Sequence, residues 1–250
     1  MPARSRLVLI GAGVVAAAAI ALGIAWLVQT SRLQARLLTT DPDRIAASPE
    51  LVSYAGSLAR PAYAHNCASC HGAKMQGDQA KGAPNLRDQT WLYDAGGIGD
   101  LERTILYGIR SGLGKSRNIT DMPAMGRTLQ LSPTEIHDVE IYVLSLTRPE
   151  TDIGAVQRGS AIFQTKGSCY DCHSSDAQGN PDYGAPNLTD NDWLYGGDPR
   201  AVYSSIYDGR HGVCPAWIGK LKPAVIRALA VYIHTVSQPK PTLRKGAVHG

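Results

Sequence analysis

The sequence predicts an all-α protein in which one membrane-spanning helix is followed by two similar helical domains. Three observations lead to this fold class: an apolar run near the start, a Cys-x-x-Cys-His motif that occurs twice, and surrounding text that repeats 102 residues later. A chain of 250 residues is long enough for two domains of about 90 to 100 residues each. The expected segments are an anchor (1–28), a linker (29–50), a first domain (51–148), a second domain (153–238) and a C-terminal tail (239–250).

The apolar run extends from Leu7 to Val28 and follows Arg4 and Arg6. Its 22 residues, at a rise of about 1.5 Å each, can cross a hydrocarbon layer of roughly 30 Å. A cleaved signal peptide is the alternative, but its apolar region is usually only about 7 to 15 residues long. The leading arginines favour a cytoplasmic N-terminus. We therefore expect a single-pass protein of the bacterial inner membrane, with residues 29–50 as a proline-bearing tether and both domains in the periplasm.

The two Cys-x-x-Cys-His motifs predict two covalently bound haem c groups. Two thiols one helical turn apart can attach to the two vinyl groups of one porphyrin, and the adjacent imidazole then reaches the iron. A thiol redox pair does not need the following histidine, and a zinc site needs a second pair of ligands. The predicted attachment residues and proximal ligands are Cys67, Cys70 and His71 in the first motif, and Cys169, Cys172 and His173 in the second.

The repeated text continues beyond the motifs. Residues 82–86 (GAPNL) match 184–188, residues 107–112 (YGIRSG) match 207–212 (YDGRHG), and Met-Pro-Ala at 122–124 matches Cys-Pro-Ala at 214–216. The first copy contains eight more residues than the second between Gly112 and Met122. Repetition over this length indicates two copies of one domain in tandem.

Helices are predicted at both ends of each copy. Ser132, Pro133 and Glu135 make a capping box that starts one closing helix, and Pro223 starts the other. Apolar stripes follow at Ile136, Val139, Val143 and Leu146, and at Ile226, Leu229, Ala230 and Ile233. Before each motif, small and aromatic residues suit the crossing of two helices: Ala59 and Tyr63, and Gly159 and Phe163.

The second axial ligand of each haem is expected just before Pro-Ala. In the first copy this residue is Met122, with Met125 as the competitor. The second domain contains no methionine, and the equivalent residue is Cys214, the fifth cysteine of the chain. We predict thiolate ligation there, with His211 as the competing ligand and a buried, inert thiol as the other alternative. A thiolate stabilises ferric iron, so the second haem should have the lower potential.

These elements together resemble the di-haem subunit III of cbb-type haem-copper cytochrome c oxidases over about residues 52–238. The resemblance implies two tandem class I cytochrome c domains that collect electrons from soluble donors and pass them to the oxygen-reducing subunit. It also implies that the carbonyls of Pro84 and Pro186 accept hydrogen bonds from the ligand imidazoles, and that Arg110 and Arg210 hold propionates. Solvated arginines are the alternative for the last pair. Members usually have a methionine before the second Pro-Ala, so Cys214 is a departure.

The resemblance further implies a haem-copper catalytic subunit, a mono-haem cytochrome subunit and a soluble donor cytochrome as partners. Two other functions compete: a di-haem dehydrogenase of thiosulfate-type sulfur compounds that uses a thiolate-ligated haem, and an anchored carrier for a nitric oxide reductase or a periplasmic dehydrogenase. The chain shows no cluster of acid and base residues that would indicate catalysis of its own. Its net charge of +4 would be offset by about four haem propionates, so nothing favours nucleic-acid binding.

Overall fold

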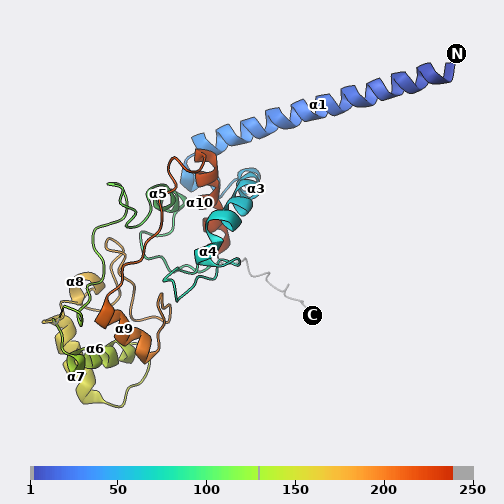
Figure 1. Ribbon diagram of the computed structural model, residues 1–250. Helices are drawn as coiled ribbons and strands as arrows, with labels where there is room; N and C mark the ends of the chain where they lie inside the picture. Colours follow the sequence, from blue (N-terminus) through green and yellow to red (C-terminus); the bar gives the residue numbers. More distant parts are fainter. Residues whose placement is uncertain (1–2, 129, 239–250) are drawn as a thin grey trace, which may run out of the picture.

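A computed structural model of the protein describes residues 3–128 and 130–238, with side chains from residue 14 onward (Figure 1). Within these residues the regular structure is helical, with isolated β-bridges and no strand, as the sequence predicts. The predicted tail, 239–250, lies outside the described residues. The helices are α1 (Ala3–Thr39), α2 (Pro42–Ile45), α3 (Pro49–Asn66), α4 (Ala68–His71), α5 (Ile98–Tyr107), α6 (Pro133–Ser145), α7 (Ile153–Gln164), α8 (Tyr170–His173), α9 (Pro199–Asp208) and α10 (Pro223–Ser237).

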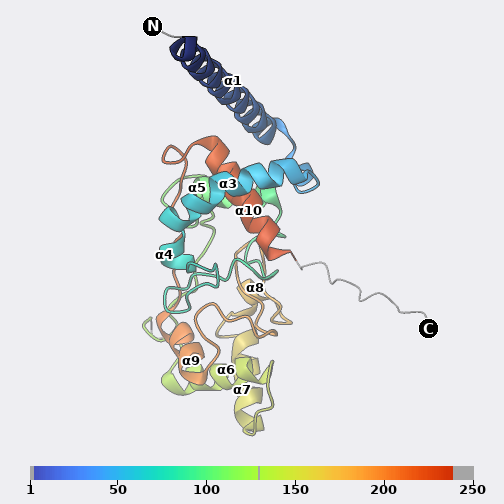
Figure 2. The same ribbon diagram turned by 90° about the vertical axis from the view of Figure 1, so that its right-hand side faces the viewer.

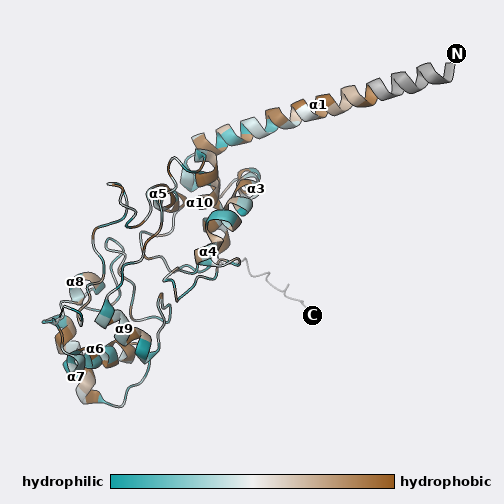
Figure 3. Ribbon diagram, in the orientation of Figure 1, coloured by the Kyte–Doolittle hydropathy of each residue, from teal (hydrophilic) through white to brown (hydrophobic). Residues whose placement is uncertain are grey.

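Helix α1 contains the predicted anchor and projects away from the rest of the molecule (Figure 1). Residues Val14–Thr39 are long and apolar enough to cross a membrane, and none of their most apolar stretch is buried within the protein. Figure 3, which colours the ribbon by hydropathy, shows apolar residues along the middle part of α1. No proline interrupts the helix before Pro42, so it continues eleven residues past the predicted end of the anchor, Val28, to Thr39.

The segment 29–50 was expected to be a proline-bearing tether, but it is mostly helical and packs on the neighbouring helices. Residues up to Thr39 are helical, and Pro42 and Pro49 each begin a helix rather than an extended chain. Leu37 and Ile45 are completely buried in the core of the neighbouring helices. The anchor is thus joined to the helical domains by packing as well as by the chain.

The remaining helices form two lobes, which are separate in both views (Figures 1 and 2). The first lobe contains α2, α3, α4, α5 and α10, and the second contains α6, α7, α8 and α9. Helix α6 belongs to the first sequence repeat and α10 to the second, yet each packs in the lobe of the other repeat. The two repeats have exchanged their closing helices.

In the first lobe, α10 crosses α3 and α5. The predicted stripe of Ile226, Leu229, Ala230 and Ile233 is buried, and it packs in one core with Ala59 and Tyr63. Arg227 forms an ion pair with Glu102 of α5, with 2.6 Å between Nε and Oε2. Its Nη1 also donates to the carbonyl of Thr40, so α10 is joined to the end of the anchor helix.

In the second lobe, α6 crosses α7 and α9. The predicted capping box at Ser132 and Glu135 is present. Gly159 of α7 lies so close to α6 that a Cβ there would be 2.0 Å from the carbonyl oxygen of Asp138. Arg158 makes two hydrogen bonds of 2.8 Å to the Asp138 carboxylate, and Phe163 packs edge-on against Tyr142. The residues predicted to lie at helix crossings therefore do so in both lobes. In each case the crossing helix is the closing helix of the other repeat.

Candidate haem sites

Each motif histidine lies at the end of a one-turn helix and points toward a proline carbonyl. His71 ends α4, and its Nδ1 is 3.0 Å from the Pro84 oxygen; His173 ends α8, and its Nδ1 is 3.0 Å from the Pro186 oxygen. The carbonyl accepts, so Nδ1 bears the proton and Nε2 has the free electron pair. The imidazole of each motif is thus oriented to bind a metal through Nε2.

The loop that holds each carbonyl repeats as closely as the motif. Asp78 pairs with Ala83 in a short bridge, and Asn180 pairs with Ala185 in the same way. Burial lowers the pKa of both His71 and His173, although the hydrogen bond to the proline carbonyl opposes this effect. A lowered pKa keeps the imidazole neutral at physiological pH, and neutral imidazole is the form that ligates iron.

One cavity of about 610 Å³ is lined by both motifs and by side chains of both lobes. Its walls include Met122 and Cys214 together with apolar side chains such as Leu86 and Leu188. Paired cysteine thiols, a histidine with a free Nε2 and apolar walls are the chemistry that a covalently attached haem requires. The residues therefore fit haem c at both motifs, and the single cavity places the two sites next to each other.

The segment that contains Cys214 lies in the first lobe. The backbone of Cys214 exchanges hydrogen bonds with Ile109, which follows α5, at 2.9 and 3.0 Å. Trp217 and Ile218 then donate to the carbonyls of Ile105 and Leu106 in α5. The Cys-Pro-Ala segment of the second repeat thus covers the site that contains His71.

The segment that contains Met122 lies in the second lobe. The backbones of Met122 and Arg210 exchange hydrogen bonds at 3.0 and 3.1 Å, and Met125 donates to the carbonyl of Ile206 in α9. The Met122 side chain packs against the core of the second lobe, which includes Leu188. The Met-Pro-Ala segment of the first repeat thus covers the site that contains His173.

This arrangement corrects the expected pairing of sites within each repeat. The sequence alignment paired Met122 with His71 and Cys214 with His173, whereas the structure places each of these two residues over the other site. Burial, the larger cause, and the neighbouring Cys70 thiol together raise the pKa of Cys214 to about 11. Cys70 belongs to the first motif, so the sulfur of Cys214 is close to the first site.

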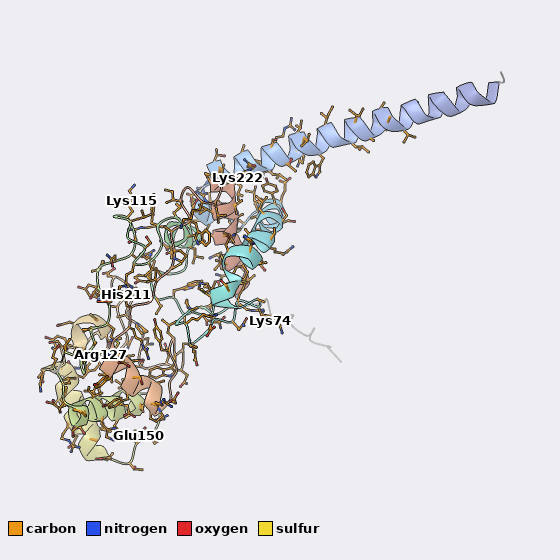
Figure 4. All side chains as sticks on the ribbon, in the orientation of Figure 1. Lys74, Lys115, Arg127, Glu150, His211 and Lys222 are labelled. Atoms are coloured by element: carbon orange, nitrogen blue, oxygen red, sulfur yellow. The ribbon has the colours of Figure 1, made fainter. Side chains whose placement is uncertain are left out.

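The competing distal ligands occupy different positions. His211 lies between the two lobes (Figure 4), where its Nδ1 is 2.8 Å from the Asp121 carboxylate. Its side chain is 59% exposed, and it is not among the described residues that line the cavity. Met125 does line the cavity and is buried beside Met122. The structure therefore disfavours His211 and leaves Met122 and Met125 as neighbouring candidates.

The arginines expected near propionates line the cavity but differ in their contacts. Arg110 donates to the carbonyls of Gly212 and Thr120, so it joins the two chain segments that cross between the lobes. The guanidinium of Arg210 lies 4.3 Å from the centre of the Tyr195 ring and donates to Ser205. These contacts hold Arg210 at the cavity of the second lobe, while Arg110 is largely occupied by backbone.

Sequence reasoning missed the first-lobe counterpart of Arg210. Arg117 lies 5.0 Å from the centre of the Tyr93 ring, donates to Thr104 and pairs with Asp94. Tyr93 is the residue that aligns with Tyr195. Arg117 falls within the eight additional residues of the first repeat, so the alignment had no partner for it. A search for arginines near the repeated tyrosines would have been needed to find it.

Sequence reasoning also missed the contact between the lobes. The ring of Tyr195 lies against Gly82, and the ring of Tyr93 lies against Gly184, so the two loops contact each other reciprocally. Gln79 donates to the Trp193 carbonyl across the same interface. The repeated glycines and tyrosines were visible in the sequence, but their purpose becomes clear only when the two lobes face each other.

Two protein-family models match the chain, one over each sequence repeat. Residues 59–147 match the family model for cytochrome c, and residues 154–233 match the model for cytochrome c oxidase, cbb3-type, subunit III. Among curated proteins, the chain is 42% identical to the cbb3-type cytochrome c oxidase subunit FixP of a Bradyrhizobium species, over 82% of this chain and 69% of the relative.

Two further relatives have similar coverage. FixP of Azorhizobium caulinodans is 41% identical over 81% of this chain and 67% of the relative. The cbb3-type cytochrome c oxidase subunit CcoP of Cereibacter sphaeroides is 38% identical over 81% of this chain and 68% of the relative. The similarity therefore extends over both haem motifs and both lobes.

Proposed function

The chain belongs to the family of cbb3-type cytochrome c oxidase subunit III, the membrane-anchored electron-transfer cytochrome of a terminal oxidase, and from this premise we propose its detailed role. We propose that the protein binds two haem c groups side by side and passes electrons through them to the catalytic subunit of the oxidase. Bound haem c supplies a one-electron iron couple. The chain itself positions, encloses and tunes that couple at each site.

The single cavity lined by both motifs is the observation on which this proposal depends. Electron transfer between two haems requires that they be close, and it needs no acid or base group. The reciprocal contacts of Tyr93 with Gly184 and of Tyr195 with Gly82 hold the two lobes face to face. A fixed interface of this kind keeps the distance between the two attachment sites constant.

We assign the residues as follows. The attachment cysteines are Cys67, Cys70, Cys169 and Cys172; the proximal ligands are His71 and His173, oriented by the carbonyls of Pro84 and Pro186; the distal ligands are Met122 and Cys214. Arg210 and Arg110 line the cavity and are the candidates to face propionates. Arg117 makes contacts in the first lobe that match those of Arg210, but it is not among the described residues that line the cavity, so we assign it a structural role.

We further propose the finer setting of the protein. The haem lobes lie in the periplasm, since Arg4 and Arg6 before the anchor favour a cytoplasmic N-terminus. The partners are the haem-copper catalytic subunit, a mono-haem cytochrome subunit and a soluble cytochrome that donates electrons. A sulfur-compound dehydrogenase is disfavoured, because the curated relatives compared above are named as oxidase subunits and match more than four fifths of this chain.

The experiment that tests this function is purification of the full chain from its native membranes. We expect the oxidase catalytic subunit to co-purify, and the pyridine haemochrome spectrum to give two covalent haems per chain. Addition of a reduced donor cytochrome should then reduce the haem with the methionine ligand, which has the higher potential of the two, before oxygen is consumed. One haem per chain, or a chain that purifies alone from membranes that contain the oxidase, would contradict the proposal.

A further inference from the structure

We infer that each haem takes its two axial ligands from different repeats: Met122 with His173 on the second haem, and Cys214 with His71 on the first. The inference rests on the proposed function only in requiring two bound haems. It reverses the assignment that the sequence alignment alone gives, and it places the thiolate on the haem of the lobe that packs against the anchor.

The Met122 segment is fixed in the second lobe by more than one contact. Besides the paired hydrogen bonds with Arg210, Gly126 donates to the Tyr207 carbonyl at 3.1 Å. Gly209 has φ +71°, and a Cβ there would be 2.5 Å from the carbonyl oxygen of Met122. The chain after α9 is thus shaped to receive the Met-Pro-Ala backbone directly.

The Cys214 segment is received in the first lobe in the same way. Gly108 has φ +73°, and a Cβ there would be 2.4 Å from the carbonyl oxygen of Cys214. Gly108 follows α5 as Gly209 follows α9. In both lobes, a glycine with positive φ leaves room for the carbonyl of the covering segment, and we call this position a glycine seat. Each covering segment lies against the glycine seat of the other repeat. This equivalence makes Cys214 the counterpart of Met122 in position and not only in sequence.

The helices that follow the two segments are exchanged between the lobes in the same way. After Met122 the chain enters α6, which packs on α7, and after Cys214 it enters α10, which packs on α3 and α5. Only residues 146–152 separate α6 from α7, and a connection this short favours two antiparallel neighbours. The ion pairs Arg227–Glu102, Arg158–Asp138 and Lys166–Glu135 each join one repeat to the other. Helix packing, segment seating and ion pairs therefore agree on the exchange.

The assignment can be tested by marking one haem at a time in the full, detergent-solubilised chain. Cys67→Ala leaves the first haem attached by one thioether and restores one vinyl group, and the longer conjugation moves its reduced α-band to longer wavelength. Cys169→Ala is the matched variant that marks the second haem. Spectroelectrochemistry then shows whether the marked haem is reduced first or last.

We expect the shifted α-band of Cys169→Ala to belong to the haem that is reduced first. When Met122→Ala is added, the haem marked in this way should be the one that loses its methionine ligation. In Cys67→Ala the shifted band should belong to the haem reduced last. The opposite assignment would overturn the exchange while leaving two haems and the proposed function intact. Loss of one haem from the wild-type chain would instead count against the proposed function.

A second test needs no variant of the haem site. Lys166 Nζ lies 2.7 Å from the Glu135 carboxylate at an exposed position, so a zero-length carbodiimide should join them by an amide within a monomer. Lys81 and Asp78, 3.1 Å apart within one loop, provide the positive control, and Lys166→Arg should abolish the first product only. If the control amide forms and mass spectrometry finds no Glu135–Lys166 amide, α6 does not pack in the second lobe and the inference fails.

Discussion

The two lobes hold their histidines alike and cover them differently. In both lobes a one-turn helix ends at the histidine, and a proline carbonyl lies 3.0 Å from Nδ1. On the opposite side, a thioether candidate from Met122 covers the second lobe and a thiol from Cys214 covers the first. The lobe with the thiol also contains the end of the anchor helix in its core.

The comparison shows that a sequence repeat and a packed lobe are not the same part of this chain. Each sequence repeat supplies the proximal half of one lobe and the distal half of the other. A change in the second repeat, such as the replacement of methionine by Cys214, therefore alters the site whose histidine belongs to the first repeat.

The largest effect is expected for Cys214→Met. A thiolate donates charge to iron and a thioether does not, so the potential of the haem attached at Cys67 and Cys70 should rise by on the order of 0.2 V, within the roughly 0.8 V that axial ligands can span. Redox titration followed by visible and electron paramagnetic resonance spectra measures this. A Cys214→Ser protein with both potentials and both spectra unchanged would show that the thiol is not a ligand.

The reciprocal change, Met122→Ala, should alter only the haem attached at Cys169 and Cys172. Loss of the thioether leaves that iron without its distal ligand, so it should become high-spin or bind water, while the thiolate signals of the other haem persist. Met125→Ala is the matched control and should keep the low-spin spectrum. If Met125→Ala abolishes the methionine signature and Met122→Ala does not, the ligand is Met125.

Breaking the partly buried ion pair of the first lobe should cost more stability than breaking an exposed pair that also joins the two repeats. The Arg227 and Glu102 side chains are only 13% and 16% exposed, so Arg227→Met should leave a largely enclosed carboxylate unpaired and lower the free energy of unfolding by about 2 kcal/mol, between the cost at an exposed pair and that at a fully buried one. Arg127→Met, at an exposed pair with Asp208, should cost less than about 1 kcal/mol. Guanidinium unfolding measures both. Equal losses would contradict the packing of α10 on α5.

A smaller effect should follow from filling either glycine seat. Gly209→Ala forces a side chain into the left-handed region and against the Met122 carbonyl, so it should cost roughly 1 to 3 kcal/mol and weaken the methionine signature of the second haem. Gly108→Ala should do the same to the thiolate signature of the first. Gly112→Ala, with φ +84° and no atom nearby, provides the control for strain without displacement. If Gly209→Ala altered the first haem, or Gly108→Ala the second, each covering segment would instead lie over the haem of its own repeat.

Much of this architecture follows from the sequence. The capping box at Ser132 and Glu135 and the apolar stripe of α10 were predicted and confirmed, because both depend on local spacing. The partner of each closing helix did not follow, since a stripe shows that a face is buried and not which helix buries it. The two repeats are similar enough that α3 and α7 offer equivalent crossing faces, so the alignment could not distinguish them.

The sites show the same division. Both motif histidines have the orientation that a proximal ligand needs, and the proline carbonyls that the resemblance implied do lie 3.0 Å from their Nδ1 atoms. The Met122 and Cys214 segments were paired with the histidine of their own repeat, because the alignment compares positions along the chain. The structure instead joins segments 88 residues apart, such as those of Met122 and Arg210, which aligned text cannot bring together. Arg117 was missed because it lies in an insertion that has no aligned partner.

The measurement that tests the exchange most directly is a nuclear Overhauser spectrum of the fully reduced protein with labelled methionine methyl groups. A methionine bound to low-spin ferrous haem has a strongly upfield methyl signal, and its neighbours identify the lobe. If the segments are exchanged, the Met122 methyl should show contacts to the second-lobe residues Leu188 and Trp193. Contacts from that methyl to their first-lobe equivalents, Leu86 and Trp91, would contradict the exchange.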